Sequence, residues 1–124
     1  MNNAPDSYKN AGLFMIIAGA FNLMQGFVLV MVSLIYGLGT FGLCCPCVIP
    51  SLIPLVAGIF EIMAGIRIQK GEVVPEAQMV SIAGLISAIL GLAMIPVIME
   101  ILVLVQLGNA ESRRYLREQS TLEG

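Results

Sequence analysis

Residues 57–65 read AGIFEIMAG and place one acid, Glu61, between two glycines in an otherwise uncharged apolar stretch. On a helix, Gly58, Glu61 and Gly65 share one face, because residues three and seven apart lie one above another. Small residues on such a face let a second backbone approach closely. We therefore expect Glu61 to face protein and not lipid.

The same frame recurs in the two other long apolar segments. It reads AGLFMIIAG at residues 11–19 and AGLISAILG at residues 83–91. If three helices alternate in direction, all three copies lie in the half of the bilayer nearer the N-terminus. The repeated frame, together with Gly26 seven residues after Gly19 in the first span, predicts close helix packing at Gly12, Gly19, Gly26, Gly58, Gly65, Gly84 and Gly91.

Composition assigns the chain to the membrane before any motif does. Of its 124 residues, 58% are hydrophobic and only 11% are charged, and the mean hydropathy is positive. A water-soluble domain of this length could not hide that much apolar surface. The sequence predicts an all-α integral membrane protein, a small bundle of three long transmembrane helices.

The predicted bundle occupies residues 11–107, between a polar N-terminal tail at 1–10 and a polar C-terminal tail at 108–124. Its three spans are residues 11–36, 48–68 and 79–107, and each provides the roughly 20 apolar residues that one crossing needs. The third span is longer than one crossing requires, and Pro96 predicts a kink in it because proline removes a backbone donor. The alternatives are four crossings or a re-entrant hairpin that turns at Pro96.

Polar side chains inside the spans are the candidate site residues, since polar groups in hydrocarbon need partners. With three alternating helices, Glu61 lies at a depth close to those of Asn22 and Ser87, and these three form the predicted cluster. Glu100 falls beyond the kink, in the opposite half. The amides of Asn22 and Gln25 are expected to make interhelical hydrogen bonds of about 1 kcal/mol each, with a solute path as the alternative.

The loop between the first two spans contains the three cysteines of the chain, Cys44, Cys45 and Cys47. Their spacing suits a disulfide, a thiol switch, lipidation or a soft metal, although small interfacial packing residues are the plainer interpretation. The chain has no histidine, and three thiols alone cannot complete a four-ligand zinc site. Thiol or metal chemistry therefore stays a secondary hypothesis, and we expect no cofactor.

Charge determines the orientation poorly in a three-crossing chain. Lys9, Arg67 and Lys70 lie on one side and the three arginines of the C-terminal tail on the other, so the positive-inside rule gives a tie. Lys9 before the first span favours a cytoplasmic N-terminus and an external tail. A fourth partial crossing would bring all six cations to one side. The net charge of −2 indicates no nucleic-acid partner.

Three functions follow from these features. The first is a non-enzymatic structural or accessory subunit in a multi-pass membrane assembly, either a homo-oligomer or a complex with other membrane subunits, held together by glycine-rich helix packing in the lipid bilayer. The second is an oligomeric proton or cation pathway at Glu61, because intramembrane acids commonly mark such routes. The third is thiol or soft-metal chemistry at the Cys44–Cys47 loop.

Overall fold

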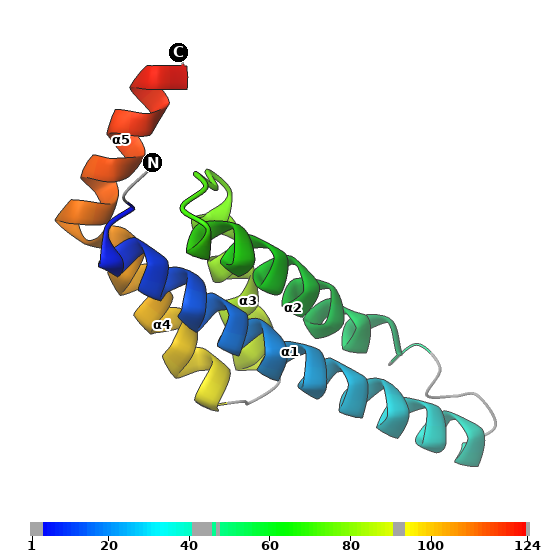
Figure 1. Ribbon diagram of the computed structural model, residues 1–124. Coiled ribbons are helices and arrows are strands. Elements are labelled where there is room, and N and C mark those ends of the chain that lie inside the picture. Colours follow the sequence, from blue (N-terminus) through cyan, green and yellow to red (C-terminus); the bar gives the residue numbers. More distant parts are fainter. Residues whose placement is uncertain (1–3, 41–45, 47, 91–93, 124) are drawn as a thin grey trace.

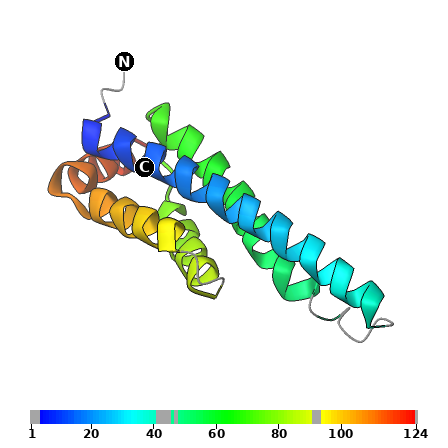
Figure 2. The ribbon, with the colours of Figure 1, turned by 90° about the horizontal axis from the view of Figure 1, so that it is seen from below.

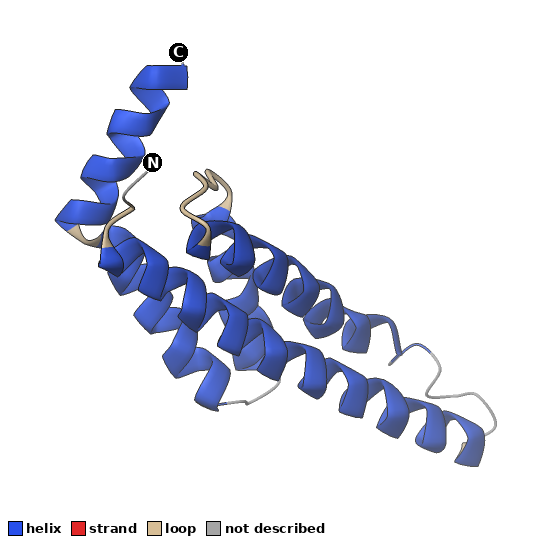
Figure 3. Cartoon of the chain, viewed as in Figure 1, coloured by secondary structure: helices blue, strands red, loops and turns tan. Residues whose placement is uncertain are grey.

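The computed structural model describes residues 4–40, 46, 48–90 and 94–123. Over these residues the chain forms helices joined by loops, without a strand, as Figure 3 shows. The helices are α1 (Asp6–Gly39), α2 (Val48–Gln69), α3 (Ala77–Leu90), α4 (Met94–Gly108) and α5 (Ala110–Glu123). The predicted all-α class is confirmed.

The first two helices form a long antiparallel pair (Figure 1). With 34 and 22 residues, α1 and α2 extend about 51 Å and 33 Å, against a hydrocarbon core of about 30 Å. Each is long and apolar enough to cross a membrane alone. A third candidate span is the pair α4 and α5, which bend by 61° relative to each other.

The third apolar segment forms two helices, so the prediction of one Pro-kinked span over residues 79–107 is wrong. Helix α3 ends at Leu90, α4 begins at Met94, and the two pack against each other. Pro96 is the third residue of α4, where its missing N–H breaks no helical hydrogen bond. The re-entrant alternative is closer to the structure, but the chain reverses between Leu90 and Met94 and not at Pro96.

The α3–α4 hairpin covers only part of the long pair. In Figures 1 and 2 it lies beside the N-terminal half of α1 and stops well before the α1–α2 connection. Its helices of 14 and 15 residues extend about 21 Å and 22 Å, less than one full crossing. Helix α3 packs mainly on α2 and α4 on α1, which encloses a common interior among the four helices.

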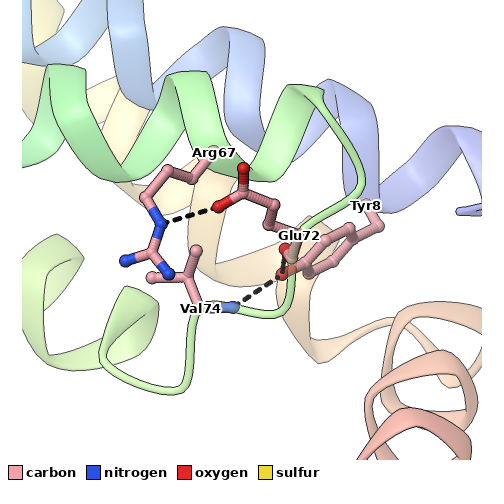
Figure 4. Close-up of polar contacts among 4 residues, drawn as sticks. All are labelled: Tyr8, Arg67, Glu72 and Val74. Atoms are coloured by element: carbon pink, nitrogen blue, oxygen red, sulfur yellow. Dashed lines mark hydrogen bonds and ion pairs between the residues drawn. The ribbon is translucent and has the colours of Figure 1, made fainter.

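The start of α1, the α2–α3 loop and α5 contact one another at one end of the bundle, which we call the terminal end. The Tyr8 hydroxyl donates to the Glu72 carbonyl at 2.8 Å and accepts from the Val74 amide at 3.3 Å (Figure 4). The Tyr115 hydroxyl of α5 donates to the Gly71 carbonyl at 2.6 Å, and its ring centroid lies 5.3 Å from that of Tyr8. The C-terminal helix α5 thus packs at the same end of the bundle as the beginning of α1.

Candidate functional site

Glycines fix the register of α1 against α2. A Cβ built on Gly19 would lie 2.8 Å from the Gly58 carbonyl oxygen, and one built on Gly12 would lie 2.8 Å from that of Gly65. These distances are too short for any side chain, so the two backbones touch. The first two copies of the repeated frame therefore pack against each other within one chain. A Cβ on Gly26 would likewise meet Leu55, at 2.7 Å.

This register sets Asn22 directly opposite Glu61. Both side chains are fully buried, and the Asn22 Nδ2 donates to both carboxyl oxygens of Glu61, at 3.1 Å to Oε1 and 2.9 Å to Oε2. Hydrogen bonds to a carboxyl group are among the stronger ones in proteins. The predicted contact between Asn22 and Glu61 is present in the structure.

The α3–α4 hairpin brings a second acid to the same place. Glu100 is fully buried on α4, and its Oε2 accepts a short hydrogen bond from the Ser81 hydroxyl of α3. A Cβ on Gly84 would overlap the Glu61 Oε1 and lie 2.5 Å from the Glu100 Oε1. Both carboxyl groups therefore lie against the bare backbone of Gly84, and only glycine leaves room for them. We call Asn22, Glu61, Ser81, Gly84 and Glu100 the carboxyl cluster.

The placement of Glu100 corrects the prediction that it lies in the opposite half of the bilayer. Its carboxyl is within hydrogen-bonding reach of the Glu61 carboxyl. The physical reason is the chain reversal after Leu90, because α4 returns along the bundle and carries Glu100 back to the depth of Glu61. A continuous third helix would have carried it about 24 Å further than Gly84 along its axis, at 1.5 Å per residue.

Two ionised carboxylates in contact inside an apolar bundle repel each other, and neither can donate a hydrogen bond to the other. Glu100 Oε1 and Asn22 Oδ1 are buried acceptors without a donor among the described residues. A proton on either acid, or a small cation between them, would supply the missing positive charge. One positive charge at the carboxyl cluster would relieve this repulsion.

Ser87 does not join this cluster, although the sequence predicted it there. Its side chain is 2% exposed, but its Oγ has no hydrogen-bond partner among the described residues. It lies one helical turn beyond Gly84, at the wall of a pocket of about 340 Å³. Ser81 lies one turn before Gly84, and its hydroxyl donates to Glu100. Ser81 was not among the predicted site residues.

Comparisons of the chain with protein-family models, curated proteins and solved structures found no match. The function is therefore argued from the chemistry of the site and not from the fold, which many activities can share.

Two predicted features fall outside the described residues. They are Gly91, the last of the packing glycines, and Cys44, Cys45 and Cys47, the candidates for thiol or metal chemistry. Within the described parts of the chain, no group of three or more His, Cys, Asp or Glu side chains is placed to hold a metal ion. The carboxyl cluster, with two acids, is therefore the candidate polar site that the structure describes.

Proposed function

We propose that this protein is a non-enzymatic integral membrane protein that binds a proton or a small monovalent cation at the pair Glu61 and Glu100. The observation that carries the proposal is the meeting of these two acids, from α2 and α4, against Gly84. A single buried acid can serve as a hydrogen-bonding group in helix packing. A second acid in contact with it adds repulsion and makes a structural role costly.

The balance of donors and acceptors supports this proposal. Asn22 and Ser81 provide one donor group each, and they leave two buried acceptor oxygens unmet, Glu100 Oε1 and Asn22 Oδ1. For packing alone, an amide in place of one acid would fill the same space, remove the charge and add a donor. The presence of two acids fits a site whose occupancy changes, because a carboxyl can gain and lose a proton and an amide cannot.

The distribution of cations supports an orientation with both termini in the cytoplasm. Lys9, Arg67 and Lys70 lie at the terminal end, and α5 adds Arg113, Arg114 and Arg117 there. All six cationic side chains of the chain thus gather at one end of the bundle. In a three-crossing chain, three of them would have been on each side of the membrane. The positive-inside rule then places the terminal end in the cytoplasm.

Flux into vesicles tests the proposed function. Purified protein is reconstituted into liposomes that enclose a pH-sensitive dye, and uptake of protons and of radioactive sodium is measured under an imposed gradient. We expect uptake of one of these ions, and its loss in both Glu61→Gln and Glu100→Gln, because the amide keeps the shape of the side chain but cannot exchange a proton or present a charge. Glu72→Gln is the matched control, since Glu72 lies exposed in the α2–α3 loop.

Absence of uptake and of saturable sodium or proton binding in the wild type would reject the proposal. Uptake that persists in both variants would also reject it, because the ion would then cross elsewhere. Size-exclusion profiles that match the wild type ensure that lost uptake does not come from misfolding.

A structural or accessory role in an assembly is the second candidate, and it needs a different surface from the one first expected. The glycine frames of α1 and α2 pack on each other within the chain, so they are not available to another copy. What supports this candidate is the far half of the α1–α2 pair, which α3 and α4 leave uncovered. Its exposed side chains include Phe27, Met31, Ile35, Ile49 and Leu52. The mass of the particle extracted in mild detergent, with any co-purifying subunits, tests it.

A further inference from the structure

A pocket adjoins the carboxyl cluster on the side away from the terminal end. Its volume is about 340 Å³, and its wall includes Gln25 of α1, Ser87 of α3, and Pro50 and Ser51 of α2. Pro50 and Ser51 belong to the first turn of α2, next to the α1–α2 connection. The pocket therefore extends from the cluster toward the end of the bundle that carries that connection.

Three buried polar atoms on this pocket wall lack hydrogen-bond partners among the described residues. Both amide atoms of Gln25 and the hydroxyl of Ser87 are inaccessible and have no hydrogen bond to any described residue, and Ser87 is 2% exposed. Burying such groups without a hydrogen bond is unfavourable. A pocket of this size has room for several water molecules at roughly 30 Å³ each, and water is the usual partner of buried polar groups.

The Gln25 amide and the Ser87 hydroxyl also lie close to the two acids along the bundle. Gln25 lies one turn beyond Asn22 on α1, and Ser87 lies one turn beyond Gly84 on α3, so each follows a member of the carboxyl cluster on the same helix face. Water that bridges Gln25 and Ser87 would thus lie one helical turn from the two carboxyl groups.

The opposite side of the cluster is closed by apolar side chains. Val103 lies one turn beyond Glu100 on α4, and Met15 lies two turns before Asn22 on α1, and neither has any exposed surface. Ile68, Leu107 and Tyr8 continue this layer, also at 1% exposure or less. The next buried polar side chains described on this side are the hydroxyls of Ser7, Tyr8 and Ser112 at the terminal end.

We propose that the carboxyl cluster is reached from one side only, through a water-filled vestibule between Gln25 and Ser87 that admits protons or small hydrated cations from the α1–α2 connection. This inference rests on the proposed cation site and adds the direction of access. In the orientation with cytoplasmic termini, the site faces the non-cytoplasmic compartment in the conformation described, and the apolar layer separates it from the cytoplasm, so that uptake across the membrane requires this layer to open transiently.

Cysteine accessibility tests the vestibule without depending on transport. In full-length protein with Cys44, Cys45 and Cys47 changed to Ser, single cysteines are introduced as Ser87→Cys and Val103→Cys. Gly39→Cys at the end of α1 and Ser120→Cys on α5 mark the two sides. Each variant is reconstituted into liposomes and treated from outside with a charged, membrane-impermeant methanethiosulfonate, and labelling is measured by mass spectrometry.

We expect Ser87→Cys to be labelled more slowly than Gly39→Cys at the surface but much faster than Val103→Cys, and Val103→Cys to react far more slowly than Ser120→Cys whether the reagent is outside or inside the vesicles. An unlabelled Ser87→Cys would overturn the vestibule, since lipid or protein would then fill the pocket. Labelling of Val103→Cys in step with Ser120→Cys would overturn the one-sided access. Ion uptake with an unlabelled Ser87→Cys would reject the vestibule alone, whereas labelling without uptake or binding would reject the proposed function alone.

Discussion

Replacing Gly58 with Ala tests how closely α1 and α2 approach. A Cβ at this position would lie 2.6 Å from the Gly19 carbonyl oxygen and 2.7 Å from the Leu23 amide nitrogen, whereas ordinary contacts begin near 3.4 Å. Both neighbours are backbone atoms, which cannot rotate away as a side chain can. The two helices must therefore separate by several tenths of an ångström along their whole contact.

The magnitude follows from two opposing effects. Overpacking a tight site costs about 1–3 kcal/mol, while alanine in place of glycine inside a helix recovers about 0.5–1 kcal/mol. Because the clash is with backbone, we expect a net loss of about 1–2 kcal/mol in the free energy of unfolding. The control is Gly39→Ala at the exposed end of α1, where an added Cβ meets no atom within 4 Å.

Both variants are measured by unfolding in mixed micelles of mild detergent and dodecyl sulfate, with loss of helix or of near-ultraviolet signal as the readout. The expected order is Gly39→Ala equal to or slightly more stable than the wild type, with Gly58→Ala less stable than both. If Gly58→Ala were as stable as Gly39→Ala, the backbones would not touch at Gly19, and the register that sets Asn22 opposite Glu61 would lose its basis.

Further outcomes follow from single contacts. Asn22→Leu removes the donor to both oxygens of Glu61 and should lower the free energy of unfolding by about 1 kcal/mol, whereas Met24→Leu, with 59% of the side chain exposed, should not change it. Tyr115→Phe removes the hydrogen bond to the Gly71 carbonyl and should speed hydrogen exchange throughout α5. Burial raises the pKa of Tyr115, so the stability that it gives to α5 docking is complete below the ordinary tyrosine pKa of about 10 and is lost as the pH rises above that value, which a pH series of limited proteolysis would detect. Glu72→Gln breaks a half-exposed ion pair with Arg67 and should leave stability unchanged within error, because such pairs contribute little.

The packing of the first two helices was predictable because the spacing of their glycines determines which helix faces can approach closely. The frames at residues 11–19 and 57–65 place glycines seven apart on both helices, and an antiparallel arrangement brings these small faces together, with Gly19 against Gly58 and Gly12 against Gly65. That arrangement also sets Asn22 opposite Glu61, so half of the carboxyl cluster followed from the sequence.

The second half of the cluster depended on where the third segment reverses. An apolar run of this length fits either one tilted helix or two short ones, because hydropathy does not register a turn made of apolar residues. Pro96 was interpreted as a kink, although proline is favoured in the first turn of a helix and therefore also marks a helix start. A helix start at Pro96 was the available signal that Glu100 returns to the depth of Glu61.

The contacts at the terminal end were beyond prediction from local pattern. Tyr8 and Tyr115 are far apart in the sequence and lie in segments that appear polar, yet both are buried. Their burial depends on the α2–α3 loop, whose carbonyls at Gly71 and Glu72 accept the two hydroxyls. Gly71 reverses the chain there with a φ of 81°, which is a left-handed conformation that glycine adopts freely.

A double-mutant cycle between Glu61 and Glu100 tests most directly whether the two acids form one site. The free energies of unfolding of Glu61→Gln, Glu100→Gln and the double variant are compared with that of the wild type in the same detergent. Side chains in contact are expected to couple by about 0.5–3 kcal/mol, whereas distant sites add within about 0.3–0.5 kcal/mol. We predict a coupling energy clearly above the additive range. Strict additivity would contradict the account, since it would place the two acids apart, as a single continuous third helix would.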